Sequence, residues 1–111
     1  MNVNLDKYWD EQKPTITVFG KEYAVDNDYK KVLGLQKFEA DMATGKDVSR
    51  EFLAFALVDG ENAADDILAH KIPFAFFQTL YFGVTAAMTG QTYEDVKKAA
   101  KDAQKRATFR G

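Results

Sequence analysis

The stretch PFAFFQTLYFGVTAAMTG, residues 73–90, is the most apolar part of the chain and decides its fold. Pro73 suits the start of a helix, where its missing N–H would have no partner. Gly90 suits the position just past a helix end. The sequence therefore predicts one helix between these two residues. At about 100° per residue, one stripe of this helix collects Phe74, Phe77, Tyr81, Val84 and Met88.

The other sides of the predicted helix are also apolar, since they carry Phe76, Leu80, Phe82 and Ala87. A helix that is apolar all round is buried on more than one face. One interpretation makes it the central helix of a small domain. The other places the stripe of Phe74, Phe77, Tyr81, Val84 and Met88 against a partner or a second copy of the chain, because exposed aromatic rings would exceed the apolar patch of an ordinary soluble monomer. We take this stripe as the candidate partner-binding surface, with Phe52 and Phe55 as supporting core.

A β-hairpin is predicted on the N-terminal side of this stretch. The β-rich runs Thr15–Phe19 and Glu22–Val25 are separated by the pair Gly20 and Lys21, and glycine accepts the positive φ of a tight turn. Alternation along the two strands gives an inner face made of Ile16, Val18, Tyr23 and Val25.

Capping residues and glycines divide the rest of the chain into helices. Besides the helix of 73–90, the expected helices run from a cap at Asp26–Asp28 to about Met42, from a cap at Asp47 or Ser49 to Gly60, from Glu61 to about His70, and from Tyr93 to about Arg106. We therefore predict a mainly α fold: a small bundle of about four to five helices with an N-terminal β-hairpin. Residues 1–13 are expected to form an N-terminal arm, and residues 14–111 a single helical domain.

Three details of these helices are also predicted. The first helix is expected to bury a face around Tyr29, Val32, Leu33 and Gln36, widened by Leu35, Phe38 and Met42. The last helix is expected to bury a narrow stripe of Val96, Ala99, Ala100 and Ala103. Gly34 and Gly83 lie inside helices, where glycine costs about 1 kcal/mol relative to alanine. We expect each of these glycines to mark the close approach of another helix.

Composition narrows the classes of function. The 111 residues fit one domain, 46% of them are hydrophobic, and the formal net charge is −2 with acidic and basic residues well mixed. No basic stripe indicates nucleic-acid binding, and no apolar run reaches the ~18 residues of a membrane span. Without cysteine, a disulfide framework and a thiolate metal site are both excluded.

No constellation indicates catalysis or a cofactor. His70 is the single histidine and is expected to be an exposed residue at a helix end. The acidic side chains of Asp59, Glu61, Asp65 and Asp66 do not follow the spacing of a calcium loop, so we interpret them as a solvated helix start. We therefore expect no enzyme activity, no metal and no cofactor.

The order of these segments resembles a known family. The hairpin TITVFGKEYAV (15–25) precedes the helix DNDYKKVLGLQKFEADM (26–42). A Phe- and Leu-rich helix then runs into DGENA (59–63), followed by the Pro-led helix ending at Gly90 and a charged last helix. This arrangement, which covers about residues 15–105, resembles the tail assembly chaperones of long-tailed bacteriophages and their prophages.

The resemblance implies a function without catalytic residues. Such chaperones act in the cytoplasm of the host cell, bind the long tape measure protein and keep it soluble while the tail assembles, and they are absent from the mature virion. A longer form made by ribosomal frameshifting is expected to recruit the tail tube protein. The alternative is a structural tail or head–tail connector protein of the virion, and a small enzyme or regulator is a third hypothesis. Self-association through residues 74–88 stays open.

Overall fold

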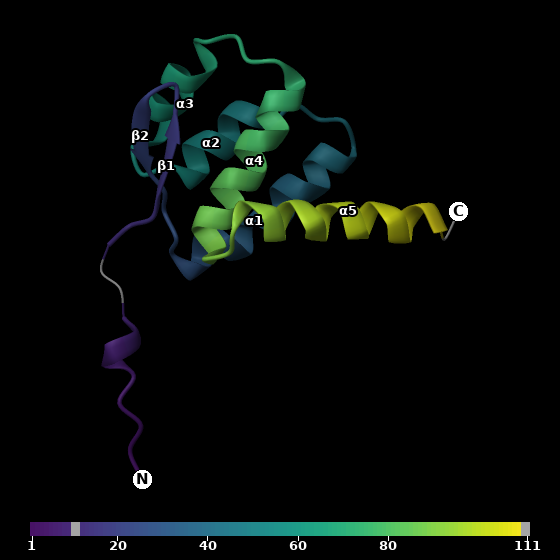
Figure 1. Cartoon of the computed structure of the whole chain (residues 1–111). Helices are drawn as coiled ribbons and strands as arrows, with labels where there is room; N and C mark the ends of the chain where they lie inside the picture. Colours follow the sequence, from purple (N-terminus) through teal and green to yellow (C-terminus); the bar gives the residue numbers. More distant parts are fainter. Residues whose placement is uncertain (10–11, 110–111) are drawn as a thin grey trace.

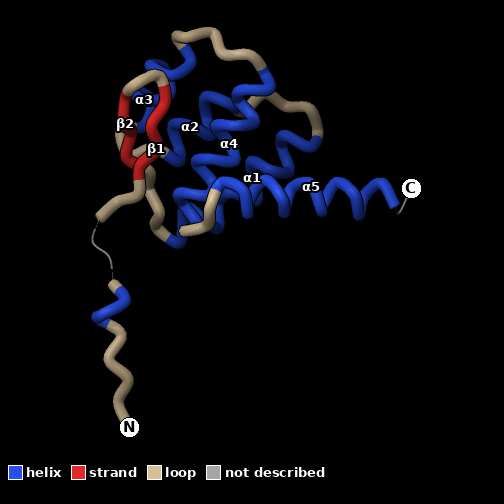
Figure 2. The backbone as a smooth tube through the Cα atoms, viewed as in Figure 1, coloured by secondary structure: helices blue, strands red, loops and turns tan. Residues whose placement is uncertain are grey.

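Helix α4 (Phe74–Thr89) runs through the middle of the molecule and contacts elements from most of the chain (Figure 1). The computed structural model describes residues 1–9 and 12–109, with side chains up to residue 103. Around α4 pack β1 (Thr15–Val18), α2 (Ser49–Ala56) and α5 (Tyr93–Phe109). The remaining elements are η1 (Asp6–Tyr8), β2 (Lys21–Ala24), α1 (Tyr29–Ala43) and α3 (Gly60–Leu68). The fold is a mainly α bundle with an N-terminal β-hairpin, as the sequence predicts, and Figure 2 shows strands in the hairpin alone among the described residues.

Both ends of α4 lie where the sequence predicts them. Pro73 occupies the N-cap position with extended backbone angles. Gly90 follows the last helical residue with φ 73°, a left-handed conformation that glycine adopts without steric cost. In this conformation the N–H groups of Gly90 and Gln91 both donate to the carbonyl oxygen of Ala86, which satisfies an acceptor that the helix end leaves free.

The hairpin turns at Phe19 and Gly20, so the predicted turn at Gly20 and Lys21 is wrong. Val18 pairs with Lys21, and the two residues between them have φ angles of 55° and 72°. Positive φ at both central positions defines a type I′ turn, whose twist matches that of the two strands. The predicted inner face is confirmed, because Val18, Tyr23 and Val25 are buried and Ile16 packs against the same core.

Backbone hydrogen bonds join the hairpin to the helices. Val25 forms an isolated antiparallel bridge with Leu57, flanked by bonds from the N–H of Asp26 to the carbonyl of Ala56 (2.8 Å) and from the N–H of Val58 to the carbonyl of Ala24 (2.9 Å). Because Leu57 is extended to make this bridge, α2 ends at Ala56 rather than at the predicted Gly60.

Helix α1 begins at the predicted cap and buries only part of the predicted face. The carboxylate of Asp28 accepts a hydrogen bond from the N–H of Lys30, which is an N-cap interaction. Leu35 is buried and Val32 and Phe38 pack against the core, so this part of the predicted face is confirmed. Tyr29 and Leu33 are exposed, so the prediction is wrong for them. The cause is α2, which packs on the side of α1 that carries Leu35 and Phe38.

Phe52 of α2 lies at the centre of the core and is completely buried. Its ring contacts Phe38 of α1 at a centroid distance of 5.8 Å, and Phe77 and Tyr81 of α4 at 6.4 and 4.9 Å. Tilted and edge-on arrangements of this kind are the favoured geometries for aromatic pairs. Phe52 of α2 therefore joins α1 and α4 in one aromatic core.

The two helix-interior glycines have different surroundings. A Cβ atom added to Gly34 would lie 2.6 Å from the Cζ atom of Phe55, so the expected close approach of another helix is confirmed there. At Gly83 an added Cβ would have no described atom within 4 Å, so the same expectation is wrong for Gly83. Among the described side chains, none of a neighbouring helix presses against the side of α4 that carries Gly83.

Two segments project from the packed part of the molecule (Figure 1). Residues 1–9 extend away from it, and α5, which begins near the C-terminal end of α4, projects with its C-terminal half beyond the packed helices. The radius of gyration is 15.6 Å, compared with about 13 Å for a compact chain of this length. In α5 only the start is well covered: Val96 is buried and Ala100 is half-buried, whereas Ala99 and Ala103 of the predicted stripe are exposed.

Candidate partner-binding surface

The exposure of the predicted contact stripe falls along α4 from the N-terminal to the C-terminal end. Phe74 is 76% exposed, Phe77 and Tyr81 are half-buried, and Val84 and Met88 are only 0% and 3% exposed. The five side chains therefore do not form one surface, and Val84 and Met88 are core residues. Of the predicted stripe, its N-terminal end alone is open to a partner.

The burial of the stripe has a clear physical cause. A stripe at helical spacing is the part of α4 best suited to fill the space against α1 and α2, where Phe52 receives both Phe77 and Tyr81. The hydroxyl of Tyr81 donates to the carboxylate of Glu39 in α1 at 3.2 Å. Burial, helped by the charge of Glu39, raises the pKa of Tyr81 far above its ordinary value, so the phenol stays a neutral donor.

Exposed aromatic side chains gather where the hairpin turn, the α3–α4 connection and the first turn of α4 meet. The ring of Phe19 stacks on the ring of His70 at 3.9 Å and lies 5.6 Å from the ring of Phe76. Phe19 is 45% exposed. Phe74 opens the same turn of α4 that carries Phe76, on the opposite side of the helix, and is the more exposed of the two rings. We call this region the tip surface and define it as Phe19, His70, Lys71, Phe74 and Phe76.

His70 is exposed just past the end of α3, as the sequence predicts. The sequence does not predict its neighbour, because Phe19 is 51 positions earlier in the chain. The one signal that could have found the tip surface is the dipeptide Phe19-Gly20: a type I′ turn favours asparagine, aspartate or glycine where this chain has a large aromatic residue.

The acidic side chains around α3 make ion pairs with other elements. Arg50 of α2 donates to Asp65 at 2.8 Å and lies 3.8 Å from Glu61, and Lys21 of β2 donates to Asp66 at 2.9 Å. The hydrogen bond from Arg50 lowers the pKa of Asp65 below its ordinary value. These exposed pairs link α3 to α2 and β2. The predicted solvated helix start fits Glu61 in the first turn of α3, but it is wrong for Asp65 and Asp66, which lie in the second half of the helix and are paired.

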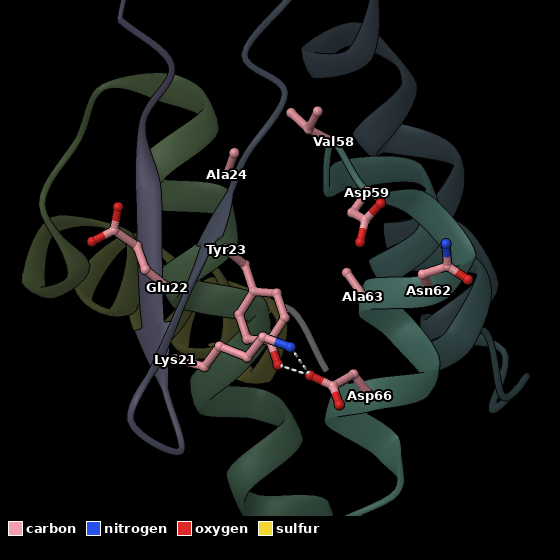
Figure 3. A pocket seen from close by; sticks show the side chains of 9 residues that line it. All are labelled: Lys21, Glu22, Tyr23, Ala24, Val58, Asp59, Asn62, Ala63 and Asp66. Atoms are coloured by element: carbon pink, nitrogen blue, oxygen red, sulfur yellow. Dashed lines mark hydrogen bonds and ion pairs between the residues drawn. The ribbon is translucent and has the colours of Figure 1, made fainter.

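A surface pocket of about 350 Å³ lies between β2 and α3 (Figure 3). Figure 3 shows the phenol of Tyr23 and the ammonium group of Lys21 converging on the carboxylate of Asp66. Hydrogen bonds from Tyr23 and then from Lys21 lower the pKa of Asp66, and the same bonds raise the pKa of each donor. The three side chains form hydrogen bonds with one another and so link the hairpin to α3. We call this group of Lys21, Tyr23 and Asp66 the latch.

Other exposed apolar side chains lie away from the tip surface. Tyr29 and Leu33 are one helical turn apart on α1. The N-terminal arm exposes a further group of large apolar residues, namely Met1, Val3, Leu5, Tyr8 and Trp9. The hydrogen bonds formed within residues 1–9 are local, such as that from the N–H of Trp9 to the carbonyl of Asp6.

Within residues 1–9 and 12–109, no group of three potential ligands among His, Cys, Asp and Glu is arranged to hold a metal ion. In the same part of the chain, no helix has the length and apolar character needed to cross a lipid bilayer. No known family model, curated protein or solved structure matches the chain. Any function is therefore inferred from the chain's own surface and sequence pattern.

Proposed function

We propose that this chain is a tail assembly chaperone of a long-tailed bacteriophage or prophage, which binds the tape measure protein in the host cytoplasm and keeps it soluble. The observation that carries this proposal is the tip surface, where Phe74 and Phe19 keep large parts of their rings in water. Leaving such rings in solvent has a free-energy cost that burial against an apolar partner removes. The order of hairpin and helices, which resembles that of this family, supplies the identity of the partner.

A long apolar helical protein suits a small surface of this kind. An amphipathic helix presents its apolar side chains at intervals of three and four residues, which the adjoining rings of Phe19 and Phe76 can contact. A single contact of this size is weak, but a long chain offers many equivalent segments, and many copies of a small domain can cover it together. A longer, frameshifted form would add a contact to the tail tube protein. In this proposal the chaperone leaves before the virion is complete.

Co-expression tests the proposal directly. The tape measure protein of the same phage or prophage is produced alone, with the wild-type chain, and with the Phe74→Ser variant, and its soluble fraction is measured. We expect the wild-type chain to raise the soluble fraction and Phe74→Ser to lower this gain. Leu33→Ser is the matched control, because it also removes an exposed apolar side chain (64% exposed) from a helix, at a site outside the tip surface.

Two results would count against the proposal. If the tape measure protein is equally soluble alone, the chain has no chaperone role toward it. Abundant copies of the chain in purified virions, measured by mass spectrometry, would instead favour a structural tail or head–tail connector protein. An equal loss of solubility with Leu33→Ser would move the binding surface away from the tip.

A further inference from the structure

The turn of the hairpin holds a large aromatic residue in an unfavourable backbone conformation. Phe19 has φ 55°, which is rare for any residue with a Cβ atom and an outlier for a bulky one. Asparagine at this position would suit the type I′ turn better. The conformation persists because the surrounding structure imposes it, and strain of this kind concentrates at functional sites.

The ring of Phe19 is partly buried and partly exposed. One face of the ring stacks on His70 at 3.9 Å with an interplanar angle of 18°, and Phe76 lies beside it at 5.6 Å. The side chain is still 45% exposed, so the turn does not hide it. Phe19 and Phe76 thus form a two-ring platform at the surface, built from the hairpin and from the first turn of α4.

The charges beside this platform are positive. Lys71, next to His70, is exposed, and among the described side chains no carboxylate lies within 4 Å of its ammonium group. Lys71 also has a positive φ of 53°, at a place after a helix end where glycine is usual. The nearby carboxylate of Asp66 is already engaged by Lys21 and Tyr23. The first turn of α4 holds no acidic side chain, so the positive end of its dipole adds to the same field.

We propose that the tip surface docks an amphipathic helix of the partner whose apolar stripe packs on Phe19 and Phe76 and whose flanking acidic side chains face Lys71. This inference rests on the proposed function in taking the partner to be a helical protein, and it adds the contact site and the charge pattern. Apolar contact supplies most of the binding energy, and the charges select the orientation and the partner.

Two designed peptides serve as probes. Each has about 20 residues, long enough to form a helix, and an identical stripe of Leu and Ala; one carries Glu beside the stripe and the other Lys. Binding to the full chain is measured by isothermal titration calorimetry at low and at physiological salt. We expect the Glu peptide to bind about three- to fivefold more tightly than the Lys peptide at low salt, with a smaller difference at physiological salt.

Variants of the tip surface separate binding from folding. Phe19→Asn removes the ring but gives the turn a residue that it favours, and we expect it to weaken binding of the Glu peptide by about fivefold or more. Phe19→Tyr keeps the ring and should bind like the wild type. Lys71→Gly removes the charge while fitting the positive φ, and should reduce the preference for the Glu peptide to the smaller part that the dipole of α4 supplies. Leu33→Asn, the matched exchange outside the tip surface, should leave both affinities unchanged. Circular dichroism establishes that each variant is folded.

The outcomes distinguish this inference from the proposed function. If the wild-type chain binds neither peptide, or if folded Phe19→Asn binds the Glu peptide as well as the wild type, the tip surface is not the docking site. Equal affinity for the two peptides would overturn the charge pattern. Binding that depends on Phe19, together with a tape measure protein that is soluble alone, would keep the site and reject the named partner.

Discussion

The two ends of α4 have similar apolar sequences and opposite surroundings. At the N-terminal end, Phe74 is exposed and Phe76 lies beside the ring of Phe19 in the hairpin turn. At the C-terminal end, Val84 and Met88 are enclosed in the core. The difference shows that an apolar stripe marks where a helix can be buried, while the neighbouring elements decide how far along the helix the burial extends.

The fall in exposure along α4 also limits the apolar area that this helix can offer to a partner. Most of its rings are satisfied within the chain: Phe77 and Tyr81 pack on Phe52, and Phe82 contacts Tyr93 of α5 at 6.3 Å. The excess apolar surface expected along residues 74–88 is thus confined to the first turn of the helix. Binding and stability should then respond to different substitutions at the two ends.

Substitution at the buried end should have the largest effect. We expect Met88→Ala to lower the free energy of unfolding by about 2–5 kcal/mol, because it leaves a cavity in a core that can collapse only partly. Urea denaturation followed by circular dichroism measures the change. A loss below about 1 kcal/mol, typical of a surface site, would mean that the C-terminal end of α4 is open and that the comparison between its ends is wrong.

Substitution at the contact between α1 and α2 should have the next largest effect on the free energy of unfolding. The Cβ atom of Gly34→Ala would lie 2.6 Å from the ring of Phe55, which Lys31 covers at 4.2 Å on one side and Phe38 contacts at 5.2 Å. Because the ring has little room to move, we expect a loss of about 1–3 kcal/mol in the free energy of unfolding. An increase in stability would show that Phe55 shifts freely and that α1 and α2 are loosely packed.

Substitution of Gly83, between the two ends of α4, should increase the free energy of unfolding instead of lowering it. Gly83→Ala adds a methyl group in open space and reduces the conformational entropy of the unfolded chain. We expect a gain of about 0.5–1 kcal/mol in the free energy of unfolding, the difference in helix propensity between the two residues. A loss instead of a gain would place another element against the middle of α4.

The latch between the hairpin and α3 should make stability depend on pH. The folded-state pKa of Asp66 is lowered from its ordinary value of 3.8, so its contribution is present above that value and is lost as the pH falls through the lowered pKa. We expect the midpoint of thermal unfolding to fall in acid, and to fall less in Asp66→Asn, which cannot titrate. Identical pH profiles for the two proteins would assign the acid sensitivity to other carboxylates, such as Asp65.

The exposed end of α4 should have the smallest effect on stability. We expect Phe74→Ala to change the free energy of unfolding by less than about 0.5 kcal/mol, because the side chain makes few contacts within the chain. The same urea titration as for Met88→Ala gives the comparison. A large loss would mean that Phe74 is part of the core, and the tip surface would then lose its most exposed ring.

Local sequence signals were sufficient for most of the helices. Pro73 and Gly90 bound α4, the carboxylate of Asp28 caps α1, and the hydroxyl of Thr92 accepts from the N–H of Asp95 at the start of α5. These signals act within a few residues, since a cap satisfies the backbone groups of its own helix end. They can therefore be recognised without knowledge of the fold.

The tip surface could not be predicted in the same way. Turns at Phe19-Gly20 and at Gly20-Lys21 both leave Ile16, Val18, Tyr23 and Val25 on one face, so alternation does not distinguish them. In the observed turn at Phe19-Gly20, the ring of Phe19 contacts His70 and Phe76. These two residues lie more than 50 positions later in the chain, so no local pattern indicates the contact.

The sequence by itself determined that the chain forms helices around one apolar segment, with a hairpin before them, because propensity, caps and periodicity are local properties. Only the tertiary structure decided which side of each helix is buried. The position of α2 turned α1 toward Leu35 and left Leu33 in solvent, and the core enclosed Met88 but not Phe74. Burial depends on packing between distant segments, and a stripe of apolar residues looks the same in the sequence whether a neighbour within the chain or a partner covers it.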